Sequence, residues 1–417
     1  MKRISTTIAI LAIAAFGLQA QDKTYFVSPE GNDNADGLSV TNAWKSIDKV
    51  NASVFQTGDR VLFEGGATFY GNLVIKSSGS PEKPIVFSGY GQGRPVINMG
   101  KEEGTAITIL NSDGLEIVGF EITSGFPPEV GVGRNGILID EREPGRAFSH
   151  IVIKDNYIHD IWGQMGGTRL RSAAISGGVM RPWRGFPSPQ NDSTLEDVLI
   201  EGNRIERVDK VGITTTGIDK LRVRRNYMDN LGGDGIIVSS SFRAVVEFNE
   251  IHRSCMRSGL LDLPGDNGWA EKGEGWWPHT AACWIIGCEE TIMQFNEVYD
   301  TGRQIRNGDG FAYDFDFYCK RCIAQYNYSK ENHGFLLLMY DIFENVARYN
   351  ISENDKTHLV QMQGSLKSDN NVLYNNVFYV DHGVSEVEYF RGDHPEKAKD
   401  INDLGAHFYN NIFYATG

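Results

Sequence analysis

A short phrase built around asparagine recurs through the chain and constrains its fold more than any other feature. The phrase places Asn beside aromatic or aliphatic residues, as in Asp-Asn-Tyr-Ile at Asn156 and Phe-Asn-Glu-Ile at Asn249. A step near 23 residues separates several of the nine copies, which centre on Asn156, Asn203, Asn226, Asn249, Asn296, Asn327, Asn350, Asn375 and Asn410. Such a period is typical of a solenoid, whose repeats bury their apolar faces only against each other. Stacked asparagines can also hydrogen-bond to one another, although ordinary turns use Asn too.

The text between the asparagines predicts strands. From about residue 60 onward, apolar stretches of four to six residues alternate with Gly, Asn or Asp turns. Strands of this length at this period predict about three strands per coil, which is an all-β, right-handed parallel β-helix. A β-propeller is the competing architecture, but it needs a period of about 40 residues or more. We therefore expect the β-helix to occupy residues 61–417.

The N-terminal region divides into two parts. Residues 1–20 have a charged start and an apolar run before a small-residue site, which is typical of a cleaved signal peptide. We expect a secreted or periplasmic protein, with the outer cell surface as an alternative location. Residues 21–60 predict a strand and then a short amphipathic helix that caps the stack, with Thr41-Asn42 as its N-cap and Trp44 on its apolar face.

The C-terminal end predicts an uncapped coil. A last copy of the repeat phrase ends only a few residues before Gly417. An exposed final coil would leave an open strand edge, so we expect either a truncated chain or another segment covering this end.

Composition limits the partners. The formal net charge of −14 argues against nucleic acid and against anionic membranes, and no second apolar run reaches membrane length. We expect a monomer.

The five cysteines give no metal site. Cys288 and Cys319 each lie eight residues before a repeat Asn, so they should stack on successive coils, either as a disulfide or as two buried thiols. The pair Cys319 and Cys322 has no second pair nearby to complete a zinc site. No cofactor is expected, with Ca²⁺ as the alternative.

Two steps in the series are 47 residues long and are interpreted as coils with insertions near 164–193 and 256–279. The first insertion holds Trp183 and the second holds Trp276 and Trp277. Long loops on a rigid scaffold often carry binding residues, and these two could wall one groove. Surface loops without function are the alternative.

The segment Asp309-Gly-Phe-Ala-Tyr-Asp314-Phe-Asp316 is the strongest candidate for chemistry. Strand alternation predicts that its aromatic residues, Phe311 to Phe317, face the core and that Asp314 and Asp316 project outward together, with Cα atoms about 6.6 Å apart. Paired carboxylates suit glycosidic-bond cleavage, in which one acid protonates the leaving oxygen and the other attacks or activates water. Calcium binding and a purely structural role are the alternatives.

A second set of residues is aligned by the repeat. Each of these four residues lies two positions before the apolar start of a strand: Asp234, His279, Asp309 and His333. We expect them to form one column, with His279 and His333 beside the Asp309 coil as an acid, a base or a metal ligand. A structural turn ladder is equally compatible with the pattern.

Residues around the acids suggest a sugar site. We expect the stretch Cys283–Ile285 one coil earlier, and Leu338 and Tyr340 one coil later, to lie beside the carboxylates. Trp276 and Trp277 should border them from the loop, since sugar rings stack on aromatic faces. Arg303 and Arg306 precede Asp309 and could hold a uronate or sulfate, or be ordinary surface charges.

At these residues the chain resembles the right-handed parallel β-helix proteins of the pectate-lyase-like superfamily. The opening Tyr25-Phe26-Val27-Ser28-Pro29 is similar to their common start. The segments around Asp309–Asp316 and His333 resemble Bacteroidetes β-helix glycoside hydrolases of the fucosidase/xylanase type. The resemblance implies catalytic acids on the central coils, hence Asp314 or Asp316, with Asp309.

These observations predict a secreted glycoside hydrolase that acts on a complex plant or algal polysaccharide. One alternative is a polysaccharide lyase on a uronate polymer, with Lys320, Arg321 or Lys330 as its base. Another is a non-catalytic glycan-binding module.

Overall fold

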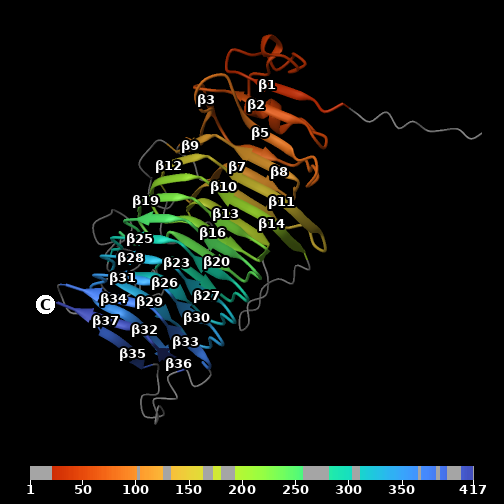
Figure 1. Ribbon diagram of the computed structural model, residues 1–417. Coiled ribbons are helices and arrows are strands. Elements are labelled where there is room, and N and C mark those ends of the chain that lie inside the picture. Colours follow the sequence, from red (N-terminus) through yellow and green to blue (C-terminus); the bar gives the residue numbers. More distant parts are fainter. Residues whose placement is uncertain are drawn as a thin grey trace, which may run out of the picture.

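The protein is a parallel β-helix. The computed structural model describes residues 21–100, 104–124, 133–162, 172–179, 193–256, 281–302, 310–364, 368–381, 386–391 and 405–416. Within them, three parallel sheets of 14, 12 and 11 strands, here sheets A, B and C, run along the molecule. The chain visits A, B and C in turn, so each circuit is one coil. Figure 1 shows the coils stacked into an elongated body, with the first coils and the last at opposite ends.

The strands of each sheet follow in stacking order. Sheet A contains β1 (Thr24–Val27), β2 (Arg60–Glu64), β5 (Ile85–Tyr90), β8 (Leu115–Val118), β11 (Ala147–Lys154), β14 (Thr194–Glu201), β18 (Arg222–Arg224), β21 (Val245–Glu247), β24 (Ile292–Gln294), β27 (Ile323–Gln325), β30 (Val346–Arg348), β33 (Asn371–Tyr374) and β36 (Ala406–Tyr409), with β17 (Ile218–Asp219) beside β14. Sheet B contains β3 (Thr68–Tyr70), β6 (Val96–Asn98), β9 (Glu121–Thr123), β12 (Tyr157–Ile161), β15 (Arg204–Val208), β19 (Tyr227–Leu231), β22 (Glu250–His252), β25 (Glu297–Tyr299), β28 (Tyr328–Lys330), β31 (Ile351–Glu353), β34 (Val377–Val380) and β37 (Ile412–Ala415). Sheet C contains β4 (Leu73–Ile75), β7 (Gly104–Leu110), β10 (Arg134–Glu141), β13 (Ala173–Val179), β16 (Val211–Thr216), β20 (Ile236–Ser239), β23 (Ala281–Ile286), β26 (Phe311–Phe315), β29 (Gly334–Leu338), β32 (His358–Gly364) and β35 (Glu386–Arg391).

The N-terminal helix is shorter than the sequence predicted. A 3-10 turn, η1 (Val40–Asn42), precedes α1 (Ile47–Asn51), whose N-cap is Ser46 and not Thr41-Asn42. Trp44 pairs with Val27 as a β-bridge outside the helix, because the chain is still extended there. Neither helix of the described residues is long enough to cross a bilayer. The role of α1 as a cap stays a prediction, and residues 1–20 lie outside the described part.

The asparagine ladder is confirmed. Asn249 accepts hydrogen bonds from the backbone N and Nδ2 of Asn226, and in turn donates from both of its own nitrogens to Oδ1 of Asn296. The same pattern runs without a break through Asn156, Asn203, Asn226, Asn249, Asn296, Asn327, Asn350, Asn376 and Asn411. Each Nδ2 also donates to a backbone carbonyl on the sheet A strand of the preceding coil, as Asn296 does to Val246. The column therefore closes the turn from sheet A to sheet B in each coil from β12 to β37.

Two ladder positions differ from the prediction by one residue. Asn376 and Asn411 occupy the column, whereas Asn375 and Asn410 take the preceding position with φ of 54° and 50°. This left-handed position also holds Phe248 and Phe295, which are aromatic and strained there. Their rings stack at 5.0 Å with planes 5° apart, so ring packing offsets part of the backbone cost.

The long steps of the repeat are single coils. Asn156 bonds directly to Asn203, and Asn249 directly to Asn296, although 47 residues separate each pair. The predicted insertion at 164–193 is not one continuous loop, because it contains the sheet C strand β13, whose Ile175 is fully buried. Both additions attach where the chain passes into sheet C, at β13 and at β23. They begin three strands apart in that sheet, about 14 Å along the stack.

The thiols are free. All five cysteines are buried and unbridged, including Cys288 and Cys319. Burial raises the pKa of Cys283 and of Cys288 to about 12, so these thiols stay protonated and unreactive. The disulfide alternative is therefore not observed, and the two stacked residues act as small core side chains.

We predict that Asn296→Ala destabilises the stack strongly. The change removes the acceptor for Asn249 and the donors to Asn327 and Val246, and a buried polar group left without a partner costs about 1–3 kcal/mol. The midpoint of urea denaturation should fall by an amount that corresponds to about 3 kcal/mol or more. The exposed Asn34→Ala is the control and should leave the midpoint unchanged; equal effects would contradict a special role for the ladder.

Glu141 places a carboxyl group inside the coil. Glu141 ends β10 and pairs with Val179 of the core, and only 3% of its surface is exposed. Its Oε1 accepts a 3.2 Å bond from the backbone N of Ser112, while Oε2 has no hydrogen-bond partner. Burial raises the pKa of Glu141 from 4.5 to about 8, against the opposing effects of Ser112 and Arg146. The side chain is therefore neutral in the folded protein at neutral pH.

Glu141 predicts a pH-dependent stability. Since the folded pKa lies above the unfolded one, the unfolded chain loses this proton first, and the free energy of unfolding falls as pH rises from about 4.5 to about 8. Glu141→Gln keeps the acceptor for Ser112 and removes the titration. Denaturation at pH 5 and pH 8.5 should show the variant gaining about 4 kcal/mol over the wild type between the two pH values, since most of the rise in pKa from 4.5 to about 8, at about 1.4 kcal/mol per pH unit, falls within this range. Parallel curves for the two proteins would contradict the buried neutral carboxyl.

Candidate functional site

The strands of sheet C do not alternate strictly between core-facing and outward-facing side chains. In β26 both Ala312 and Tyr313 belong to the main core, followed by Phe315. Phe311 instead packs in a separate outer cluster with Ala281 and Leu337. The prediction that all the aromatic residues of this segment face the core is therefore wrong for Phe311. It is also wrong for Phe317, which is half-buried. A strict two-residue alternation cannot describe a strand that turns two consecutive side chains inward.

The two predicted acids lie on the outer face of sheet C. Asp314 stands between the core residues Tyr313 and Phe315, so its side chain points away from the core. Asp316 follows the end of β26, and its Oδ1 accepts a 2.7 Å bond from the backbone N of Phe317. Both are nearly buried, at 5% and 8% exposure. Burying two carboxylates at successive outward positions costs free energy unless hydrogen bonds or charges compensate it, and proteins retain such groups at functional sites. These two acids therefore mark the outer face of sheet C as the candidate site.

The sequence predicted that the stretch Cys283–Ile285 lies beside the acids but did not single out its tryptophan. Trp284 of β23 is the strand partner of Asp314, and its indole Nε1 donates a 2.8 Å bond to Oδ1 of Asp234. The same Asp234 oxygen accepts a 3.1 Å bond from the backbone N of Ala281. Asp234 is 3% exposed. The outer face thus holds three nearly buried carboxylates around one half-buried indole ring.

His333 lies at the other end of the same face. Its backbone N donates to Oγ1 of Thr301 at 3.0 Å, and its Nδ1 lies 3.2 Å from Oγ1 of Thr357. The ring contacts Phe311 and His358 at centroid distances of 6.2 and 5.8 Å. Leu337, four residues further on, is the partner of Asp314, so His333 begins about 13 Å away along the strand. The two residues share a face but are not in contact.

The predicted Asp–His column is not what the structure shows for its described members. Gly334 pairs with Phe311, and Phe311 pairs with Ala281, whose backbone N is bonded to Asp234. Asp234 therefore aligns one position later than His333. Ile236 pairs with Cys283 and Phe311 pairs with Gly334, so the first apolar residues of neighbouring strands are not opposite each other and counting from them gives the wrong column. The predicted neighbour Leu338 likewise faces the core, and Leu337 takes its place beside Asp314.

Of the predicted binding residues, only Tyr340 is described. It is half-buried and stacks on Phe317 at 5.6 Å, one strand beyond the Asp316 turn. The others lie outside the described residues: Asp309, His279, Trp276, Trp277, Arg303, Arg306 and Trp183.

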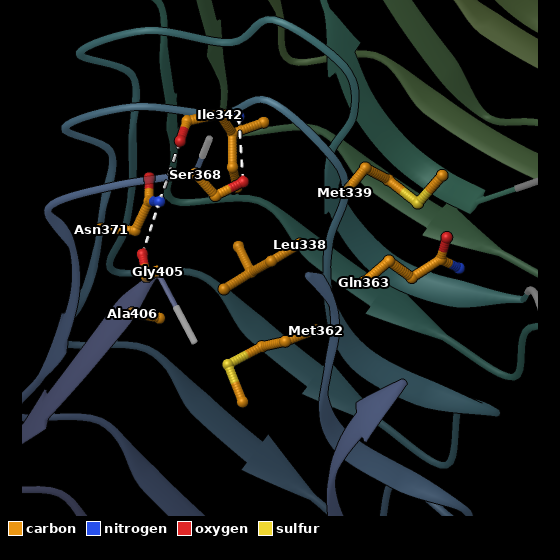
Figure 2. A pocket seen from close by; sticks show the side chains of 9 residues that line it. All are labelled: Leu338, Met339, Ile342, Met362, Gln363, Ser368, Asn371, Gly405 and Ala406. Carbon is orange, nitrogen blue, oxygen red and sulfur yellow. Dashed lines mark hydrogen bonds between the residues drawn. The ribbon is translucent and has the colours of Figure 1, made fainter. Parts of the chain in front are cut away.

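A small pocket lies near the C-terminal coils (Figure 2). Its floor includes Leu338, Met339 and Met362, and Nδ2 of Asn371 crosses one side to donate to the carbonyls of Ile342 and Gly405. None of the nine described residues that line it is ionisable. The residues that line the pocket therefore offer no acid or base.

The described residues give the alternatives little support. Of the three proposed lyase bases, Arg321 is paired with Glu289 and Glu290, and Lys330 is paired with Glu353 on sheet B. Lys320 forms β-bridges with Glu289 and Phe343 in the connection between β26 and β27. In the part of the chain that the structure describes, no group of three ligands is placed to hold a metal ion. The Ca²⁺ alternative is not tested by this observation.

Comparison with known proteins finds lacto-N-biosidases among the similar proteins. No family model matches the chain. A lacto-N-biosidase of Bifidobacterium longum subsp. longum is 28% identical over 446 aligned residues, which cover 86% of this chain and 27% of that protein. The chain thus spans about a quarter of the length of this relative.

Two solved structures share the fold. They are the native and selenomethionine forms of a glycoside hydrolase family 136 lacto-N-biosidase from Eubacterium ramulus, with TM-scores of 0.72 and 0.74. Each is 22% identical and covers 94% of this chain and 68% of its own. The likeness establishes the parallel β-helix. The predicted resemblance to the fucosidase/xylanase type is not supported, because the relatives that match well carry a different name.

We predict that Tyr313→Phe loosens the strand that carries Asp314. The buried hydroxyl of Tyr313 lies 2.9 Å from the carbonyl oxygens of both Asn296 and Tyr328 and ties β26 to sheet B. Its loss should lower the free energy of unfolding by about 1–2 kcal/mol in urea denaturation. The exposed Tyr409→Phe serves as the control. An equal loss of unfolding free energy in this variant would contradict a stabilising role for the Tyr313 hydroxyl.

Proposed function

We propose that this chain is a glycoside hydrolase that cleaves a glycan at a lacto-N-biose unit. The observation that carries the proposal is the pair of nearly buried carboxylates, Asp314 and Asp316, on the outer face of sheet C. The name of the 28% identical relative supports the reaction and the substrate class. A plant or algal polysaccharide, predicted from the sequence, finds no support among these relatives.

The proposed mechanism uses two acids from this segment. One carboxylic acid protonates the leaving glycosidic oxygen, and the other carboxylate attacks the anomeric carbon or activates water. Asp314, Asp316 and Asp309 are the candidates, with His333 as a possible helper at the far end of the face. Apolar neighbours such as Leu337 and Phe311 favour a neutral acid next to a charged one, since burial penalises ionisation.

The proposal also covers the sugar contacts, the location and the assembly of the protein. Trp276, Trp277, Trp183, His279, Arg303, Arg306 and Tyr340 are proposed sugar contacts. The protein is proposed to be exported, monomeric and independent of cofactors. Right-handed coiling and the N-terminal cap are part of the same proposal.

The reaction is tested with a chromogenic aryl lacto-N-bioside and with free oligosaccharides. Release of the phenol and of a new reducing end supports hydrolysis. An ultraviolet-absorbing unsaturated uronate end would instead establish a lyase, and binding without turnover a glycan-binding module. Proton NMR of the first product separates retention from inversion.

We predict that two of the three acids are indispensable. Among Asp309→Asn, Asp314→Asn and Asp316→Asn, two should lower kcat by about 10²–10⁴-fold without lowering the melting temperature. Azide rescue of one variant would identify the nucleophile of a retaining enzyme. Glu247→Gln, on the outer face of sheet A, is the matched control and should keep full activity. Near-normal activity in all three Asp variants would remove the acids of this segment from the mechanism.

A further inference from the structure

The outer face of sheet C carries an aromatic residue that the two-acid proposal does not use. Trp284 points away from the core, since its neighbours Cys283 and Ile285 are core residues. It is half-buried, while the preceding residues of β23 are buried. Its strand partners are Ile237 on one side and Asp314 on the other. A tryptophan therefore stands about 4.8 Å from a candidate acid, measured between strands.

The ring has an apolar bed. Two small clusters lie on this face: Ala173, Val211 and Ile237 form one, and Ala281, Phe311 and Leu337 form the other. Trp284 packs against both clusters and joins them. One part of the ring is thus fixed against aliphatic side chains, and the rest stays accessible. A sugar ring binds best to an aromatic surface of this kind, flat and held still.

A buried carboxylate fixes the indole. Asp234 Oδ1 accepts from Nε1 of Trp284 at 2.8 Å and from the backbone N of Ala281 at 3.1 Å. A charge-assisted bond to a group that is itself held by backbone leaves the ring one orientation. Asp234 lies on the coil before Trp284 and Asp314 on the coil after it, so Trp284 stands between two carboxylate residues along the stack.

We propose that Trp284 is the floor of a sugar-binding subsite next to Asp314, and that Asp234 is the positioning residue that sets the ring. The ligand is a pyranose with an apolar face of C–H groups, as β-galactosides present. This inference rests on the proposed function and assigns one sugar ring of the substrate to this platform. The exposed stack that begins with Phe248 and Phe295 is a poorer platform, because its rings cover each other's faces.

The test measures ground-state binding apart from catalysis. Trp284→Leu, Trp284→Phe, Asp234→Asn and Asp234→Ala are compared for KM, kcat and calorimetric binding of the free disaccharide lacto-N-biose. Removing the ring in Trp284→Leu should raise KM and the disaccharide Kd by about three- to tenfold. Trp284→Phe keeps a ring and should lie in between. Asp234→Asn keeps an acceptor oxygen and should bind nearly as the wild type, whereas Asp234→Ala should bind as weakly as Trp284→Leu.

A double-mutant cycle identifies the positioning role. If Asp234 acts through the ring, Asp234→Ala combined with Trp284→Leu binds no more weakly than Trp284→Leu alone. Additive losses would show an independent role for Asp234 and overturn that part. Phe295→Leu on the A–B corner is the control for loss of an aromatic ring and should leave KM and Kd unchanged.

The outcomes separate this inference from the proposed function. Hydrolysis by the wild type with unchanged KM and Kd in Trp284→Leu and Trp284→Phe overturns the platform and leaves the hydrolase standing. No turnover, but disaccharide binding that depends on Trp284, overturns the hydrolase and supports the platform. Neither turnover nor binding overturns both. Should Trp284→Leu fail to fold, Trp284→Phe and the two Asp234 variants decide in the same way.

Discussion

The column of buried asparagines is the constraint on which the rest of the structure depends. Each member satisfies the backbone of one turn and passes a hydrogen bond to the next coil, so no turn can shift without leaving a buried donor unpaired. The column runs through the coils from β12 to β37, which include those that carry Trp284 and Asp314. In sheet C of these coils, Asp314 lies beside Trp284 and Tyr313 beside Cys283.

The fold was predictable because its signal repeats. A period near 23 and the recurrent Asn gave the three-stranded coil, and the direct bond from Asn249 to Asn296 confirms that a 47-residue step is one coil. The repeat did not show which residue of each turn occupies the column. Asn375 and Asn410 look like ladder residues, yet their left-handed backbone places the next Asn in the column. A doubled Asn offers two choices, and only the three-dimensional turn decides between them.

The candidate site was predictable in part, for the same reason. Asp314 and Asp316 stand out as charged residues inside an aromatic strand, and the structure puts both on the outer face. The surroundings of Asp314 were predicted in part: Trp284 of the expected stretch lies beside it, whereas Leu337 takes the place expected for Leu338, because Phe311 pairs with Gly334 and not with Phe335. Asp234 and Trp284 come together because β20 and β23 are neighbours in sheet C, although 50 residues separate the two residues in the chain.

Both long additions attach at sheet C, so the segments that we predict to carry binding residues are separate from the asparagine column that supports the fold. Asn156 and Asn249 reach across their 47-residue steps to the next rung as if nothing had been added. Segments added at sheet C do not interrupt the asparagine column. Such segments can therefore be exchanged between related chains while the spacing of the coils stays the same. Diversification of ligand preference in such proteins would then proceed by swapping these segments, with the column inherited intact.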